Sequence, residues 1–152
     1  MIVENLADEE LGSENHAELW LRFCEGLGLK REEVLAAKAL PETEEAIENF
    51  RALSANGHFA SGIAAMYAYE SQIPEVAKTK REGLKKFYGI DSKRAVKFFK
   101  VHEKADVWHS EVERRIMKKY AKKIGKGHLL SSVAKARDSL WLFLDGVQRA
   151  YC

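Results

Sequence analysis

FFKVHEKADVWHSE, residues 98–111, places ionisable side chains inside an apolar helical pattern. His102, Asp106 and His109 are spaced i, i+4 and i+7, so an α-helix turning by about 100° per residue gathers them within an arc of about 60°. The apolar residues of the same segment lie on or beside this face: Phe98, Ala105, Val112 and Ile116. The pattern therefore predicts a helix that points three ionisable groups inward, where each is costly unless something pairs with it.

The rest of the chain continues the helical spacing, and no stretch alternates with period two for long enough to form a strand. Proline followed by acidic residues marks helix starts at Pro41 and Pro74. Glycines mark the expected ends and breaks: Gly26 with Gly28, Asn56-Gly57, Gly89, and Gly125 with Gly127. The predicted helices cover 14–27, 41–55, 58–72, 74–88, 92–123 and 128–150, with a short helical turn near 31–37. We expect one all-α domain over residues 1–152.

Composition excludes several classes of protein. The 152 residues are 46% hydrophobic and 32% charged, which is too rich in core-forming residues for a disordered chain. The net charge of +2 is too even for a nucleic-acid binder, and no apolar run reaches the roughly 18–20 residues of a membrane span. The N-terminus lacks a signal-peptide pattern, and Cys24 and Cys152 do not suggest a disulfide framework. We expect a soluble cytoplasmic protein.

Other ionisable residues repeat the anomaly of the first segment. Glu70 follows Met66 by four residues and Ile63 by seven, on the apolar face of its own predicted helix, while Glu9 and His16 are seven apart. Together the candidates provide three carboxylates and three imidazoles: Glu9, His16, Glu70, His102, Asp106 and His109. Carboxylates bridge two cations and imidazoles fill terminal positions, so this set suits a dinuclear metal site in a helical bundle.

A structural interpretation of the same residues stays open at this point. A single histidine on a helix is more often a surface or hydrogen-bonded residue than a ligand, and Glu9 lies in an acidic run that is typical of a solvated face. His58 and His128 stand beside likely helix ends, and we interpret them as structural.

Lys80, Tyr67 and Tyr69 are candidates for chemistry near such a site. Lys80 falls on the Val76–Leu84 stripe, so its amine either extends out to water or points, with a lowered pKa, into a cavity. Tyr67 and Tyr69 lie within a turn of Glu70. We interpret them as residues that line the core, as hydrogen-bond donors to the site or as redox-active phenols.

Four motifs together resemble the haem-oxygenase-like di-metal oxidase family, which is related in fold to the TenA and PqqC proteins. The motifs are Glu9-x6-His16, NHAELWLRFCEGLG (15–28), YAYESQIPEVAKTKREGLKKFYG (67–89) and FFKVHEKADVWHSE (98–111). One chlamydial member associates with death domains and makes para-aminobenzoate. The resemblance assigns the six candidates above as metal ligands, and it assigns the family's essential lysine to Lys80.

The resemblance implies an O2-dependent enzyme with two metal ions, iron with iron or manganese with iron. In the para-aminobenzoate synthases of the family, which supply a folate precursor, the substrate is a tyrosine of the protein itself and the lysine donates the amino group. Alternatives are a TenA- or PqqC-like enzyme that acts on a small molecule without metal, and a helical interaction module.

The resemblance also implies a difference from the family. Its members carry further helices before the point that aligns with the start of this sequence, and the sacrificed tyrosine lies among them. We therefore consider an inactive short form beside the active oxidase. Uncovered apolar surface of this kind favours self-association, so we expect a homodimer or larger homo-oligomer.

Overall fold

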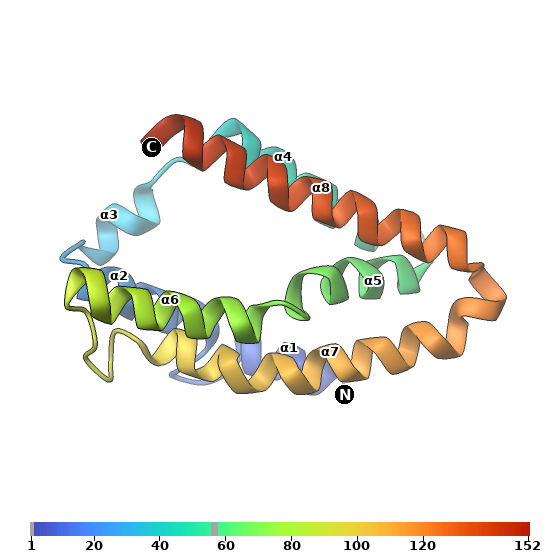
Figure 1. Ribbon diagram of the computed structural model, residues 1–152, viewed down its shortest axis with the longest axis horizontal. Coiled ribbons are helices and arrows are strands. Elements are labelled where there is room, and N and C mark those ends of the chain that lie inside the picture. The colour runs from blue at the N-terminus through green and yellow to red at the C-terminus, as the bar shows by residue number, and fades with distance from the viewer. Residues whose placement is uncertain (1, 56–57) are drawn as a thin grey trace. The chain divides into compact units, whose positions relative to one another are not determined.

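The computed structural model describes residues 2–55 and 58–152, and every regular element within them is an α-helix. In chain order the helices are α1 (Ile2–Glu10), α2 (His16–Gly26), α3 (Arg31–Ala36), α4 (Pro41–Ala55), α5 (Phe59–Glu70), α6 (Ile73–Tyr88), α7 (Lys97–Ile124) and α8 (Lys126–Tyr151) (Figure 1). The all-α prediction is confirmed. None of these helices combines the length and the apolar character that a membrane span requires.

The helices form two compact units, and α7 passes from the first to the second between His109 and Ser110. The first unit contains the residues up to Ala37 together with Gln72–His109. The second contains Lys38–Ser71 and Ser110–Cys152. The expectation of a single domain over 1–152 stays a prediction.

The core of the first unit is built by α2, α6 and the first half of α7. Phe23 and Cys24 of α2 pack with Ala77 of α6 and Phe99 of α7, and partly buried Phe98 packs against this cluster. The core fixes the helix that carries His102 relative to the helix that begins with His16. It therefore gives two of the predicted ligands a rigid support.

The second unit packs α8 along α4 and α5 (Figure 1). Ala60 and Ala64 of α5 and Leu129 of α8 form its buried cluster. Six consecutive α5 residues are buried, from Ala60 to Ala65. This helix is therefore enclosed on most sides, whereas the sequence predicted a single apolar face. Phe59, the first residue of α5, is exposed.

Several predicted boundaries are confirmed. Helix α4 covers 41–55 as predicted, and α6 ends at Gly89, whose φ of +67° is the left-handed conformation that glycine adopts without a steric penalty. Two predictions were wrong. Helix α1 was not predicted, and α7 begins at Lys97 instead of residue 92, because residues 93–96 form turns first. The predicted break at Asn56-Gly57 lies outside the described residues.

Candidate metal centre

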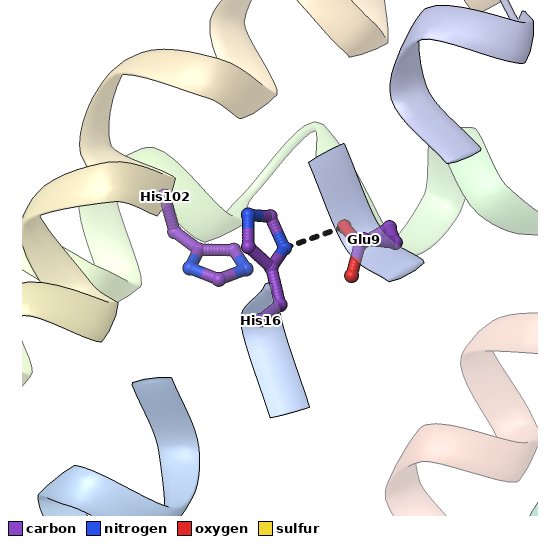
Figure 2. A group of neighbouring side chains, drawn as sticks. All are labelled: Glu9, His16 and His102. Atoms are coloured by element: carbon purple, nitrogen blue, oxygen red, sulfur yellow. Dashed lines mark ion pairs between the residues drawn. The ribbon is translucent and has the colours of Figure 1, made fainter. Parts of the chain in front are cut away.

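Three helices of the first unit bring Glu9, His16 and His102 together (Figure 2). Each residue offers one ligand atom, and these atoms lie within 4.8 Å of one another. His16 Nδ1 is 2.7 Å from a Glu9 carboxylate oxygen, and the His16 and His102 ring centroids are 4.3 Å apart. The cluster joins the last turn of α1, the first turn of α2 and the second turn of α7. Residues that are 93 positions apart in the sequence thus meet at one point.

The orientation of the His102 ring is fixed by its own helix. His102 Nδ1 lies 2.7 Å from the Phe98 carbonyl oxygen, which can only accept, so we assign the ring hydrogen to Nδ1. The lone pair of Nε2 is then available to a metal ion, an arrangement typical of histidine ligands. The Phe98 ring lies 4.2 Å from the His102 ring, and Trp20 packs on the edge of Phe98. These aromatic contacts support two of the candidate ligands.

Two pKa shifts favour the forms of these side chains that bind metals. Burial is the main cause that lowers the pKa of His102, which keeps the imidazole neutral. Burial alone would raise the pKa of Glu9, but the hydrogen bond and the charge of His16 are the main causes that outweigh burial and lower that pKa. A deprotonated carboxylate therefore stands beside imidazoles, one of which is held neutral by burial.

Asp106 and His109 lie one and two turns beyond His102 on α7, and both are buried. His109 Nδ1 is 3.3 Å from an Asp106 oxygen. Burial, with the charge of Glu9 acting in the same direction, raises the pKa of Asp106 to about 7. A carboxylate in such a place is costly, and a bound cation would offset that cost and favour the charged form.

The donor set fits the metal ions that the sequence implies. Carboxylate and neutral imidazole are ligands that iron and manganese accept. The cluster of Glu9, His16 and His102 offers three such groups at mutual distances that a single ion can span. The predicted ligand Glu70 belongs to the second unit, where it is buried at the end of α5. Its participation stays a prediction.

The remaining candidates are placed differently from the metal ligands. The Lys80 side chain is exposed, which is one of the two placements that its position on the stripe left open, and the buried residue of that part of α6 is Ala77. Lys80 falls within an arc of about 60° around the helix axis together with Ile73, Ala77 and Leu84 of the packed face, and its long side chain carries the amine out to water. Tyr67 is half-buried. Tyr69 is exposed and lines an apolar groove of about 440 Å³ in the second unit.

The two histidines interpreted as structural make structural contacts. His58 accepts a hydrogen bond from the Ala60 backbone N–H as the N-cap of α5, and His128 Nε2 lies 2.8 Å from the Ser61 hydroxyl. Both contacts agree with the structural interpretation, which stays a prediction.

Glu113 is a buried carboxylate that the sequence interpretation missed. It follows His109 by four residues on the continuous helix α7, and only 2% of it is exposed. The i, i+4, i+7 series from His102 would have reached it at i+11, so extending the same periodicity by one turn was the missing signal.

A family model described as iron-containing redox enzyme matches residues 1–142 of this sequence. The chain belongs to this family. The haem-oxygenase-like resemblance and the helical fold that it implies are therefore confirmed. Membership also shows that iron is the metal to expect at a site of this composition.

Curated relatives of this chain are named 4-aminobenzoate synthase, and three of them illustrate the similarity. The relative from Nitrosomonas europaea is 42% identical over 152 residues, which cover 99% of this chain and 62% of the relative. Those from Chlamydia pneumoniae and Chlamydia trachomatis are 35% and 33% identical, over 95% of this chain and 64% and 62% of their own lengths. The chain thus spans less than two thirds of the length of the curated relatives it matches.

Proposed function

We propose that this chain is an O2-dependent, non-haem dinuclear metal oxidase of the 4-aminobenzoate-synthase type. The observation that carries the proposal is the cluster of Glu9, His16 and His102 in a member of the iron-containing redox enzymes. The name shared by the three relatives supports the product, an aromatic amino acid that serves as a folate precursor. For a chain of this length the proposal includes both forms considered above, the active oxidase and the inactive short form.

In the proposal, two groups of residues hold two metal ions. Glu9, His16 and His102 would hold one, and Asp106 and His109 would hold the other together with Glu70. Three carboxylates would neutralise most of the charge of two divalent ions, which is the physical reason to place this many acids in an interior. Bound iron, or a manganese–iron pair, would supply the electrons that reduce O2.

The substrate in this proposal is either a tyrosine of the protein itself or a small phenol, and Lys80 would donate the amino group. An exposed lysine can deliver nitrogen only to a group that reaches the surface of α6, so Lys80 acts at the edge of the site. Tyr67 and Tyr69 precede Glu70 by three residues and by one residue, and they are the phenols of this chain nearest in sequence to a proposed ligand.

Self-association is part of the proposal. Large apolar side chains on one side of α8 are exposed: Leu130, Trp141, Leu144 and Tyr151. Helical spacing places these four within an arc of about 80°. Exposed apolar surface of this extent is typical of interfaces, and we propose a homodimer or larger homo-oligomer.

The test is metal content after anaerobic loading with Fe²⁺ and gel filtration, measured by mass spectrometry of the elements. We expect close to two iron ions per chain in the natural sequence and a loss of at least one in His102→Ala. His128→Ala is the matched control, because it removes an imidazole that bonds to Ser61 instead of lying in the cluster. Equal iron content in all three proteins, or none in the natural sequence, would refute the proposal.

A further inference from the structure

Glu9 reaches the cluster from α1, a helix whose large apolar side chains, as far as the structure describes them, are exposed. Val3 and Leu6 of α1 are exposed, and so is Leu11, which follows the helix. The connection from Leu11 to Asn15 leads directly to α2, which begins at His16. The distance between the Glu9 carboxylate and the other two ligands therefore depends on how this connection is held.

One side chain, Arg22 of α2, binds the connection at two points. Its Nη1 donates to the Glu14 carboxylate at 2.6 Å, and its Nη2 donates to the Ser13 carbonyl oxygen at 3.1 Å. Its Nε donates to Glu18 on the same helix at 2.8 Å, which fixes the plane of the guanidinium. The Arg22 side chain is only 19% exposed. A guanidinium held this way is a rigid fork, in contrast to a surface ion pair with two mobile partners.

Further contacts hold the same connection from both sides. Lys97, the first residue of α7, forms an ion pair with Glu14. Asn15 accepts a hydrogen bond from the Glu18 backbone N–H at 2.9 Å as the N-cap of α2, and its amide donates to the Glu10 carbonyl at 3.4 Å. Glu14 is thus held between α2 and α7, the two helices that supply His16 and His102.

We propose that Arg22 is a positioning residue for the metal centre, which holds the connection between α1 and α2 through Glu14 and Ser13 so that Glu9 lies beside His16 and His102. This inference rests on the proposed function, because the hydrogen bonds of Arg22 can position a metal ligand only if Glu9 binds a metal ion. Arg22 touches neither the ion nor the substrate in this role.

The physical consequence is a lower metal affinity when the fork is removed. Without it, residues 11–15 gain conformational freedom, and that freedom must be lost again whenever Glu9 binds. Residues that orient metal ligands typically change affinity by about 10- to 100-fold when mutated. Lysine keeps the charge but cannot donate to Glu14, Ser13 and Glu18 in one plane, so it should restore only part of the affinity.

The experiment is a titration of the metal-free protein with Co²⁺, followed by visible absorption. We expect Arg22→Gln to weaken the tighter Co²⁺ site by about 10-fold, with Arg22→Lys intermediate. Arg31→Gln is the matched control, because Arg31 also binds Glu18, at 2.6 Å, while its hydrogen bonds and ion pairs in the described structure go to Glu18 and Glu25 and not to residues 11–15. Arg31→Gln should leave the Co²⁺ affinity within twofold of the natural protein.

A double-variant cycle separates positioning from general destabilisation. Once Glu9 is replaced by Gln, there is no carboxylate left to position, so adding Arg22→Gln to Glu9→Gln should cause no further loss of affinity. A merely structural role would instead give additive losses. Additive losses, an unchanged affinity in Arg22→Gln, or an equal loss in Arg31→Gln would each overturn the inference.

The failure of the proposed function would look different. If Glu9→Gln and His102→Ala also leave Co²⁺ binding unchanged, the cluster is not a metal site and both proposals fail. If these two variants lose affinity while Arg22→Gln does not, the metal centre stands and only the role of Arg22 is refuted.

Discussion

Single residues carried the most information where an ionisable group stands in an apolar series. His102, Asp106 and His109 were identified from spacing alone, and all three are buried in the structure. The same logic placed Lys80 on an apolar stripe and left two positions open for its amine, and the structure exposes the side chain, because a long amphipathic side chain can reach water from such a face. Periodicity predicts the direction of a Cβ atom, but it does not determine where a flexible chain of four carbons ends.

Asp106 gives a pH-dependent prediction for the metal-free protein. Its pKa is about 7 in the folded protein and near 4 when unfolded, so the folded state binds the extra proton and loses stability as the pH rises from about 4 to 7. Asp106→Asn should therefore stabilise the metal-free protein at pH 8, by roughly 2 kcal/mol, with little effect at pH 4. Urea unfolding in the presence of a chelator measures both values.

A loss of stability in Asp106→Asn at pH 8 would contradict this prediction. If Asp106→Asn destabilises the metal-free protein at pH 8 as much as at pH 4, the carboxylate is stabilised in the fold by protein groups and does not need a cation. Asp145→Asn is a suitable control, because it makes the same change at an exposed aspartate.

Among helices, the ones with clear start and stop residues were predicted closely, as α4 after Pro41 and α6 before Gly89 show. Helix α1 was not predicted because residues 2–10 contain no proline or glycine that would mark the start or the end of a helix. The late start of α7 has a different cause. Ser92 does accept a hydrogen bond from the Ala95 N–H, but the chain makes turns before it becomes helical at Lys97.

Close packing between elements predicts the effect of a glycine substitution. A Cβ atom at Gly26, the last residue of α2, would lie 2.5 Å from the Ala95 Cβ, too close for either to remain in place. We expect Gly26→Ala to destabilise the protein by about 1–3 kcal/mol. Gly127→Ala is the control in the first turn of α8, where nothing lies within 4 Å, and it should be neutral or stabilising by up to about 1 kcal/mol. The test is thermal unfolding of both variants. Equal midpoint temperatures for Gly26→Ala and Gly127→Ala would contradict the close approach of Gly26 to Ala95.

For the whole molecule, the family was predictable because four motifs spread over residues 9–111 share one pattern. The sequence identified Glu9, His16 and His102 as candidate ligands, but it could not predict how close together they lie. Spacing within a helix says nothing about distances between helices. The division into two compact units has no signal in composition or in glycine and proline content, because α7 runs through the boundary without a break.

The proposed self-association gives a prediction for the whole molecule. Sedimentation velocity at tens of micromolar should show a dimer or larger species, and Trp141→Glu with Leu144→Glu should shift it to the monomer, because both side chains are exposed on α8. Leu35→Glu, at an exposed leucine of α3 in the first unit, is the control and should not change the mass. A natural protein that sediments as a monomer would contradict the proposal.

Anomalous scattering at the iron edge, from crystals of the protein loaded anaerobically with Fe²⁺, locates the metal itself. The proposed centre predicts one peak bounded by Glu9, His16 and His102 and a second beside Asp106 and His109. Diffraction from iron-loaded crystals with no anomalous peak at these five residues, or with iron bound only elsewhere on the surface, would contradict a metal centre in this interior.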